Sequence, residues 1–454
     1  MYDAAIIGAG IIGSSIAREL SKYNLKTVLI EKSYDVSNGS TKANSAIVHA
    51  GYDPTPNTFM AEFNVRGNTM FPQLCKELSV PFKQMGSLVI AFSDEDIDIV
   101  HQLYERGKIN GVPNIKILKK DEILRIEPNI NTNVKKALWC GTAGIVSPYE
   151  LAIALCENAQ INGTEIKLNC EVLDIKKSDD YFEITTTQSK IKSKLVINAA
   201  GVYADKINNM VSADKFKINP VKGQYLLLNK TTGNLAKHVI FQCPTALGKG
   251  VLVTPTVYGN TLIGPDAQET QSKNDTSICE ENFEYIKETA LKSFPEIPFK
   301  KTIKTFAGLR AEADSNDFII GESKDVQNFI NVAGIKSPGL SSSPAIAFHV
   351  SSIVLSKFDM VDKKKEFSPF RQSPMLKYMN KETGDKLIKT DSSYSNIICI
   401  CEHITEGEIK DAISRPPQAT TRDGVKRRVR AGMGPCQGHR CGPKVDIILS
   451  GNKQ

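Results

Sequence analysis

The chain has 454 residues, too many for one hydrophobic core, and this length predicts about two to four domains. Its 41% hydrophobic and 24% charged residues are ordinary for a water-soluble globular protein. The net charge of +7 is small for this length and aromatic residues make up only 7%, so we expect no nucleic-acid binding.

Membrane insertion and secretion are also not expected. No segment has the run of about eighteen or more apolar residues that a membrane-spanning helix needs. The first expected strand begins close to Met1 and leaves no room for a targeting peptide. The sequence predicts a cytoplasmic protein, and peripheral attachment to the inner face of the membrane through a partner stays an open alternative.

The first residues have the pattern of a nucleotide-binding unit. Residues 3–7 (DAAII) form a short apolar run, typical of a buried parallel strand, and residues 8–13 (GAGIIG) follow it. Residues 14–23 predict a helix, and residues 27–30 (TVLI) predict a second strand that ends at Glu31. This order is the strand–turn–helix–strand unit of dinucleotide-binding folds.

The three glycines of this unit have different expected roles. Gly8 permits a tight turn, Gly10 lets the backbone approach a pyrophosphate, and Gly13 lets the helix pack on the strand. The pyrophosphate would lie at the positive end of the helix, and the Glu31 carboxylate would accept hydrogen bonds from a ribose diol. The same acid disfavours NADP. A glycine-rich turn without a ligand is the alternative, but strand, helix, spacing and acid all favour a dinucleotide.

Later segments distinguish FAD from NAD. Residues 194–201 predict a buried strand that ends in small residues (NAAG), and residues 329–333 predict another, followed by 334–343 (GIKSPGLSSS) and a helix at 343–355. With the glycine motif, these segments resemble the D-amino-acid-oxidase-like flavoprotein superfamily over residues 1–355. An ordinary helix N-terminus is the alternative for 334–343.

The resemblance implies bound FAD. The sequence has no compelling residue for covalent attachment, so we expect the FAD to be noncovalent. The resemblance also implies which residues contact the FAD. These residues are Gly8, Gly10, Gly13, Glu31, Lys32, Ser40, Asn44, Ser45, Val172, Ala200, Gly201, Gly308, Gly334, Gly339, Leu340 and Ser341.

In this superfamily the stretch corresponding to residues 40–51 (STKANSAIVHAG) runs along the FAD towards the flavin. A neutral imidazole of His49 could there take a hydroxyl proton while hydride leaves for the flavin. A histidine that packs against the flavin or hydrogen-bonds the backbone is an equally weighted alternative.

Residues 305–312 (TFAGLRAE) place Arg310 where the resembling enzymes anchor the anionic end of the substrate. A structural ion pair with Glu312 or Asp314 is the alternative. Residues 220–225 and 242–255 are expected to line the opposite wall of the site. There Lys249 is the better candidate for an anionic substrate, while a solvated lysine is the usual reading for Lys222 and Lys249 alike.

The chain has 10 cysteines in two groups. Six are scattered and are expected to be small buried apolar residues: Cys75, Cys140, Cys156, Cys170, Cys243 and Cys279. The other four form a C-x-C pair and a C-x-x-x-x-C pair near the end of the sequence: Cys399, Cys401, Cys436 and Cys441.

Four thiolates from two short loops can bind zinc or an iron–sulfur cluster, and the tight C-x-C pair makes zinc the less favoured alternative. Residues 399–409 and 432–441 resemble the bacterioferritin-associated-ferredoxin-like [2Fe–2S] domain. Between them, residues 405–413 predict a helix with a capping box of Thr405 and Glu408. The basic run 426–430 (KRRVR) could offset the negative charge of a cluster; a solvated helix face is at least as well supported.

Strand patterns typical of a nucleotide-binding domain alternate along the chain with patterns typical of an antiparallel sheet. We expect further strands at 171–175, 181–186, 222–228 and 250–254, and a helix at 148–162. We therefore predict an α/β plus α+β fold with a Rossmann-like FAD-binding domain, an inserted antiparallel-sheet substrate domain and a small helical cluster-binding domain. The predicted ranges are 1–80, 145–215 and 305–360 for the first, 81–144 and 216–304 for the second, 361–395 for a linker, and 396–454 for the last.

The combination resembles the catalytic subunits of anaerobic glycerol-3-phosphate dehydrogenases. It implies an anionic substrate, hydride transfer to FAD, and electrons passing through [2Fe–2S] to a partner subunit or flavoprotein, as a hetero-oligomer. Other open readings are an L-2-hydroxyglutarate or other 2-hydroxy-acid dehydrogenase and an amino- or imino-acid dehydrogenase. A non-catalytic electron-transfer subunit is the alternative of another class.

Overall fold

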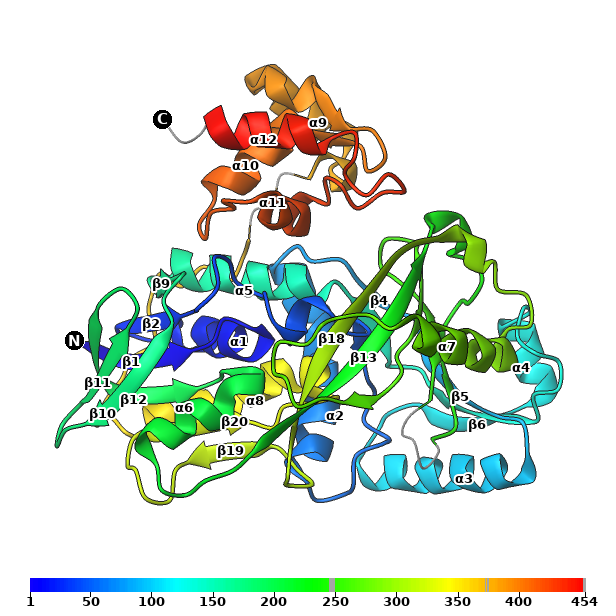
Figure 1. The fold of residues 1–454 in the computed structure, drawn as a ribbon, viewed down its shortest axis with the longest axis horizontal. Helices are drawn as coiled ribbons and strands as arrows, with labels where there is room; N and C mark the ends of the chain where they lie inside the picture. Colours follow the sequence, from blue (N-terminus) through cyan, green and yellow to red (C-terminus); the bar gives the residue numbers. More distant parts are fainter. Residues whose placement is uncertain (245–249, 372, 374, 452–454) are drawn as a thin grey trace.

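A computed structural model of the chain describes residues 1–244, 250–371, 373 and 375–451. Figure 1 shows two large sheets with their helices, and a small helical unit, drawn in orange and red, that lies above α5 (Pro148–Ile161). The predicted fold class is confirmed, because the chain combines a parallel nucleotide-binding sheet with a largely antiparallel second sheet. No helix in the described ranges combines the length and apolar character needed to cross a membrane.

The first sheet has a parallel core built from three separated stretches of sequence. Its parallel strands, in spatial order, are β20 (Phe329–Ala333), β12 (Lys190–Asn198), β1 (Tyr2–Ile7), β2 (Thr27–Ile30) and β9 (Glu165–Lys167). Three antiparallel strands extend it: β10 (Val172–Lys177), β11 (Phe182–Thr186) and β19 (Ile319–Glu322).

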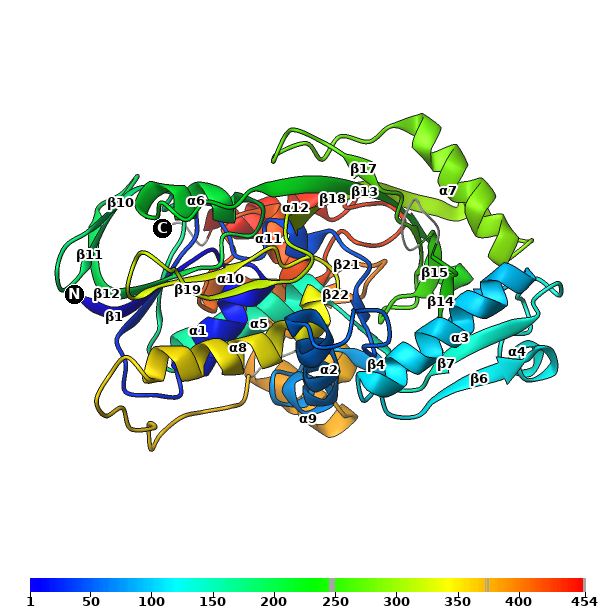
Figure 2. The same cartoon turned by 90° about the horizontal axis from the view of Figure 1, so that it is seen from below.

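Both faces of this sheet are covered, which explains the apolar runs in the sequence. In β1, Ala4 and Ile6 join one hydrophobic cluster with α1 (Ile11–Leu20), α5 and α8 (Gly339–Leu355). Ala5 and Ile7 point to the other face, where α6 (Ala204–Val211) packs. The alternation follows from the two-residue period of a strand. Figure 2 shows α8 beside α1 and α2 (Phe59–Glu77).

Helices α1 and α8 begin earlier than the sequence predicted. Helix α1 starts at Ile11 directly after Gly10, and α8 starts at Gly339, not at Ser343. Helix α2 comes very close to the start of α8, since a Cβ on Gly67 of α2 would lie 2.1 Å from the carbonyl oxygen of Ser341.

The second sheet is built around a long antiparallel ribbon of β13 (Ile218–Leu228) and β18 (Thr302–Ala313). It continues through β14 (Val239–Gln242), β15 (Leu252–Pro255), β16 (Thr261–Gly264), β17 (Gln268–Glu269), β5 (Ser87–Ala91), β7 (Lys136–Cys140) and β6 (Ile115–Lys119). Helices α3 (Asp94–Ile109), α4 (Lys120–Ile126) and α7 (Glu280–Ser293) pack on it. The domain limits stay a prediction; they assign most of β18 to the FAD-binding part, whereas its partner β13 belongs to this sheet.

A third, small sheet joins β3 (Ile47–Val48), β8 (Gly144–Val146) and β4 (Phe82–Gln84). It carries the segment that leads to His49.

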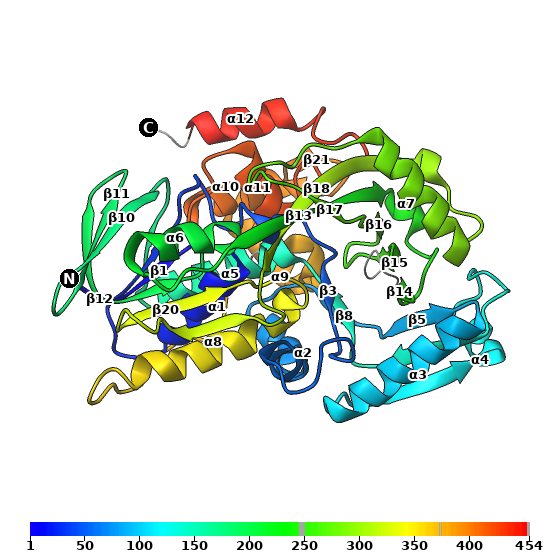
Figure 3. The same cartoon turned by 60° about the horizontal axis from the view of Figure 1, so that its bottom comes forward.

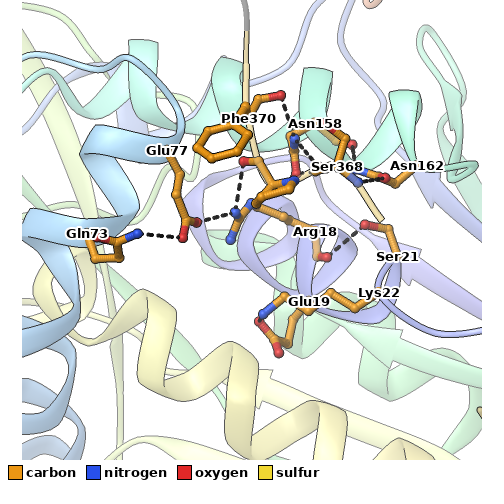
Figure 4. A network of polar contacts seen from close by, with 11 residues as sticks. Arg18, Glu19, Ser21, Lys22, Gln73, Glu77, Asn158, Asn162, Ser368 and Phe370 are labelled. Carbon is orange, nitrogen blue, oxygen red and sulfur yellow. Dashed lines mark hydrogen bonds and ion pairs between the residues drawn. The ribbon is translucent and has the colours of Figure 1, made fainter. Parts of the chain in front are cut away.

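The segment after α8 runs along the surface of α1 and α5 (Figure 4). Arg18 donates to Asn158 at 3.0 Å and pairs with Glu77 at 2.6 Å, and it also donates to the carbonyl of Pro369. Asn158 donates in turn to the Ser368 carbonyl at 3.0 Å. The predicted linker is therefore held by buried polar side chains, and it also contains α9 (Lys381–Thr390).

The last unit is helical, as predicted, with α10 (Glu406–Ser414), α11 (Arg422–Val429), α12 (Gly442–Gly451) and a short hairpin of β21 (Ile397–Cys399) and β22 (Ile404–Thr405). The capping box is confirmed: Thr405 accepts from the Glu408 backbone N–H and Glu408 accepts from that of Thr405. Helix α11 contacts α5, and Figures 1 and 3 show this unit on one side of the remaining molecule.

Candidate cofactor and substrate site

The carboxyl ends of β1, β2, β12 and β20 meet at one edge of the first sheet. Gly8 follows β1, Glu31 follows β2, Ala199 and Ala200 follow β12, and Gly334 follows β20. In open α/β sheets this edge is where ligands bind. The structure thus brings together residues that are more than 300 positions apart.

The glycine turn has no room for side chains. Gly8 has φ +103°, and a Cβ there would lie 2.5 Å from the carbonyl oxygen of Ala199. A Cβ on Gly13 would lie 1.9 Å from the carbonyl oxygen of Gly8, so helix α1 packs directly on the turn. A Cβ on Gly10 would lie 3.3 Å from Oγ1 of Thr41. This cradle fits a dinucleotide, because the glycine turn gives a phosphate close access to the N-terminus of α1.

Polar groups next to the cradle organise it. The Glu31 carboxylate accepts from the backbone N–H of Ala9 at 2.8 Å and of Ser33 at 2.9 Å. Thr41 Oγ1 accepts from the Ile11 N–H at 2.9 Å.

The sequence prediction missed Ser37. Its backbone is left-handed, at φ +60°, its N–H donates to the Ala9 carbonyl, and its buried hydroxyl has no partner among the described residues. The sequence signal that could have identified Ser37 is a hydroxyl residue that shortly follows Glu31. The buried hydroxyl without a partner and the glycine cradle together fit bound FAD.

The second and third expected segments are held by a ladder of buried amides. Asn198 donates to Asn331 at 2.8 Å, and Asn331 donates to Asn208 at 2.9 Å. This ladder fixes the ends of β12 and β20 beside the cradle. Gly201 and Gly334 have φ of +57° and +64°, so both turns use backbone conformations that favour glycine.

The other expected cofactor contacts fall into three places. Asn44 donates to the carbonyls of Ser40 and Thr41 and accepts from Ala46, which closes the loop from 40 to 46. Ser45 lies 3.3 Å from the Tyr225 hydroxyl. Gly308 packs on this loop, since a Cβ on it would lie 1.9 Å from the Ala43 carbonyl oxygen.

The remaining expected contacts lie elsewhere: Lys32 lies over the Tyr203 ring, Val172 is buried in β10, and Gly339, Leu340 and Ser341 begin α8. Their contacts with FAD remain a proposal.

His49 has a tightly held backbone. Its N–H donates to Ser341 Oγ at 2.7 Å, and its carbonyl accepts from Asn64 at 2.7 Å and Asn68 at 3.1 Å. Its ring lies 5.6 Å from that of Phe241, and Nε2 lies 3.4 Å from Ser337 Oγ. A small pocket opens beside the ring, lined by His49, Tyr52, Asp53, Val89, Leu103, Phe241, Gln242 and Pro244.

Arg310 lies on β18 opposite Val221 of β13. Its Nη2 donates to the Asp266 carbonyl at 3.0 Å, and a Cβ on Gly223 would lie 2.7 Å from the same nitrogen. Within the described ranges it makes no ion pair, because Glu312 pairs with Lys336 and Asp314 accepts from Asn219. The guanidinium therefore keeps donors for an anion.

The two lysines expected on the opposite wall differ. Lys222 is buried and pairs with Asp275 at 2.8 Å, so the expectation of a solvated lysine is wrong. The hydrogen bond from Lys222 holds the pKa of the Asp275 carboxyl well below its usual range. Strand β13 turns this side chain inward, which its sequence neighbourhood did not indicate. Lys249 lies outside the described residues.

The four clustered cysteines come together in the last unit. Cys401 Sγ and Cys436 Sγ lie 3.8 Å apart, and burial together with the neighbouring Cys399 raises the pKa of Cys441 to about 12. Across the described ranges no set of three or more His, Cys, Asp or Glu side chains forms a closed metal site.

Glycines leave room around these sulfurs. A Cβ on Gly434 would lie 2.3 Å from Cys401 Cβ, and Gly432, with φ +91°, faces Cys441 Sγ. Four thiols and a glycine cradle fit a thiolate-ligated cluster.

Two expectations from the sequence are corrected, one on the burial of the scattered cysteines and one on the basic run 426–430. Of the scattered cysteines, Cys279 is only partly buried, while the other five are buried as predicted. The reading of 426–430 as a solvated face is wrong for Arg427, Arg428 and Arg430, which are at most 5% exposed. Arg427 and Arg428 face Asp35 of the loop after β2, and Arg430 faces Glu402 of its own unit, which a charge run in sequence does not report.

Comparison with known proteins agrees with these sites. The family described as FAD dependent oxidoreductase matches residues 3–353, and the BFD-like [2Fe-2S] binding domain matches residues 397–450.

A glycerol 3-phosphate dehydrogenase of Caloramator mitchellensis is 53% identical over 99% of this chain and 94% of its own length. The mitochondrial L-2-hydroxyglutarate dehydrogenase of Arabidopsis thaliana is 27% identical over 77% of this chain and 83% of its own.

A solved structure has the same fold. The dithionite-reduced L-alpha-glycerophosphate oxidase of Mycoplasma pneumoniae, with FAD bound, superposes with a TM-score of 0.78 at 30% identity, covering 82% of this chain and 99% of that one. Together with the family matches, this confirms the predicted FAD and [2Fe–2S] cofactors. The chain belongs to the FAD dependent oxidoreductase family and carries a BFD-like [2Fe–2S] binding domain in residues 397–450.

Proposed function

We propose that this dehydrogenase oxidises glycerol 3-phosphate to dihydroxyacetone phosphate and passes the electrons through the [2Fe–2S] domain to a partner protein. The similarity over nearly the whole chain to the Caloramator glycerol 3-phosphate dehydrogenase supports the substrate. The observation that carries the proposal is Arg310, whose guanidinium has no carboxylate partner among the described residues. A guanidinium suits a phosphate dianion.

Each side chain has one task in this proposal. FAD, when bound, supplies the acceptor for the hydride that leaves the hydroxyl-bearing carbon. Arg310 binds the phosphate of the substrate, and the His49 imidazole takes the hydroxyl proton. The Ser341, Asn64 and Asn68 contacts hold the His49 backbone so that the imidazole keeps its position. The aromatic wall of Phe241 keeps water from that side.

An L-2-hydroxyglutarate dehydrogenase is the second candidate, because Arg310 would bind a carboxylate equally well. The relative with that activity is only 27% identical to this chain, against 53% for the glycerol 3-phosphate dehydrogenase. We further propose that the electron acceptor is a partner subunit or flavoprotein, that the enzyme works in the cytoplasm, and that it meets the membrane through that partner.

Anaerobic spectroscopy tests the substrate. We expect glycerol 3-phosphate to bleach the flavin absorbance of the purified protein within seconds, and dithionite to produce the electron paramagnetic resonance of reduced [2Fe–2S]. Bleaching by L-2-hydroxyglutarate or proline and not by glycerol 3-phosphate would reject the substrate and retain the fold. A flavin that none of the three reduces would favour a non-catalytic electron-transfer subunit.

A further inference from the structure

Helix α11 joins the catalytic part to the cluster-binding unit through its arginines. Arg427 and Arg428 lie in its last turn, and Arg430 follows with a left-handed backbone at φ +68°. This backbone turn directs Arg430 to a different neighbour from the other two. The three guanidiniums therefore contact two separate loops, one on each side of the interface.

The first loop follows β2 and packs against the glycine turn that forms the FAD cradle. Asp35 is 1% exposed and accepts from Arg428 through both oxygens, at 2.7 and 2.9 Å, and from Arg427 at 3.0 Å. Arg427 also donates to the Val36 carbonyl at 2.6 Å. Two residues after Asp35, the Ser37 N–H donates to the Ala9 carbonyl inside the glycine turn.

The second loop is the one that carries the first cysteine pair. Glu402, directly after Cys401, accepts from Arg430 Nε at 3.0 Å and from Lys230 at 2.9 Å. Arg430 also donates to the Tyr149 hydroxyl at 3.2 Å, and its guanidinium stacks 3.5 Å above the Tyr258 ring. Both carboxylates are thus buried against arginines that lie in α11 or directly follow it.

Buried ion pairs contribute little net stability compared with apolar contacts, but they fix geometry, and removing one partner is costly. A run of buried arginines that contacts both cofactor loops is therefore better explained by positioning than by stability. We propose that α11 is a strut that fixes the separation of the FAD cradle and the cluster loop, with Asp35 and Glu402 as its two anchor points. The three arginines and the two anchor carboxylates are positioning residues, since none of them belongs to the glycine turn or to the four clustered cysteines.

The inference rests on the proposed electron relay. In that relay each substrate molecule would give two electrons to bound FAD. The cluster would pass them on one at a time to two molecules of a one-electron acceptor. Electron transfer between two fixed sites slows as the distance between them grows, so a change in that distance would lower the rate at which the flavin reduces the cluster. The strut would keep this separation constant during turnover.

The test uses Asp35→Asn, Arg430→Met and the conservative Arg430→Lys in the full-length holoenzyme, with Lys410→Gln as control. Lys410 pairs with Glu406 on the surface of the same unit, and its side chain is 54% exposed. Stopped-flow absorbance separates flavin reduction by glycerol 3-phosphate from the later reduction of the cluster. We expect flavin reduction to keep its rate and cluster reduction to slow several-fold.

Hydrogen exchange supplies a readout that does not need turnover. If α11 couples the two loops, loosening one anchor point should also loosen the loop at the other. Arg430→Met should therefore increase exchange in residues 33–37, and Asp35→Asn should increase exchange in residues 399–403. If each substitution loosens only its own loop and cluster reduction keeps its rate, the strut is refuted. If the wild-type flavin never reduces the cluster, the relay fails, and the reciprocal exchange alone decides the strut.

Discussion

The backbone N–H of His49 donates to Oγ of Ser341 at 2.7 Å, although 292 positions separate the two residues. This contact ties the first turn of α8 to the segment that leads from the cradle to the substrate pocket. Ser341 is fully buried, so its hydroxyl has no water to replace this donor. The position of the proposed base thus depends on a hydroxyl far away in sequence.

Substitution Ser341→Ala should weaken catalysis without removing FAD. An unsatisfied buried N–H costs ~1–3 kcal/mol, so we expect kcat with glycerol 3-phosphate to fall about tenfold as His49 shifts. Ser351→Ala is the control, because Ser351 is a buried residue of the same helix. Its hydroxyl donates only to the Phe348 carbonyl among the described residues. Equal rates in both variants would mean that Ser341 does not position His49.

Substitution His49→Asn tests the proton transfer. A positioned general base contributes ~100- to 10,000-fold, so kcat should fall by that factor while the flavin spectrum persists. The exposed His101 serves as control through His101→Asn. A rate within a few-fold of wild type would leave His49 only the packing role beside Phe241.

Substitution Arg310→Met should act on substrate binding. Hydrogen bonds to charged groups are worth ~1.5–3 kcal/mol, so KM for glycerol 3-phosphate should rise about 10- to 100-fold. Arg125→Met, on an exposed position of α4, is the matched control. An unchanged KM would show that the anion binds elsewhere.

Substitution of Cys401 or Cys436 by serine should remove the cluster and spare the flavin. Iron and acid-labile sulfide should fall to background, while glycerol 3-phosphate still bleaches the flavin. Cys279→Ser is the control, since Cys279 lies in the second sheet region, on the loop before α7. Loss of zinc in place of iron would establish the alternative metal.

Lowering the pH should weaken the contact between α5 and the C-terminal unit, because the Glu157 carboxylate becomes protonated. Burial raises the pKa of this carboxyl, but Arg371 and Arg415 outweigh it, with Arg428 adding to them, and hold it below the ordinary 4.5. A lowered pKa stabilises the fold above pH 4.5, and this stabilisation is lost as the pH falls through the folded value.

The free energies of unfolding of wild type and Glu157→Gln, measured by urea titration, should therefore differ most near neutral pH, by on the order of 3 kcal/mol, and converge in acid. Glu183→Gln removes a surface pair with Lys190 and should change little at any pH. A difference between wild type and Glu157→Gln that persists in acid would contradict this assignment.

Local spacing was enough to predict both cofactor-binding sites. The glycine turn at 8–13 with Glu31, the two cysteine pairs, and the Thr405–Glu408 capping box each depend on neighbours within a few residues or on one strand length. These local patterns predicted a dinucleotide site and a four-cysteine metal site, and the resemblance of the longer segments to known families implied FAD, [2Fe–2S] and the fold class.

Only the tertiary structure decided which side chains meet across long separations. Residues 426–430 read as a solvated basic run, whereas Arg428 is buried against Asp35; Lys222 read as a surface lysine, whereas it pairs with Asp275. A charge has the same appearance in sequence whether water or a carboxylate faces it. Its environment depends on how strands and helices pack, which no local pattern encodes.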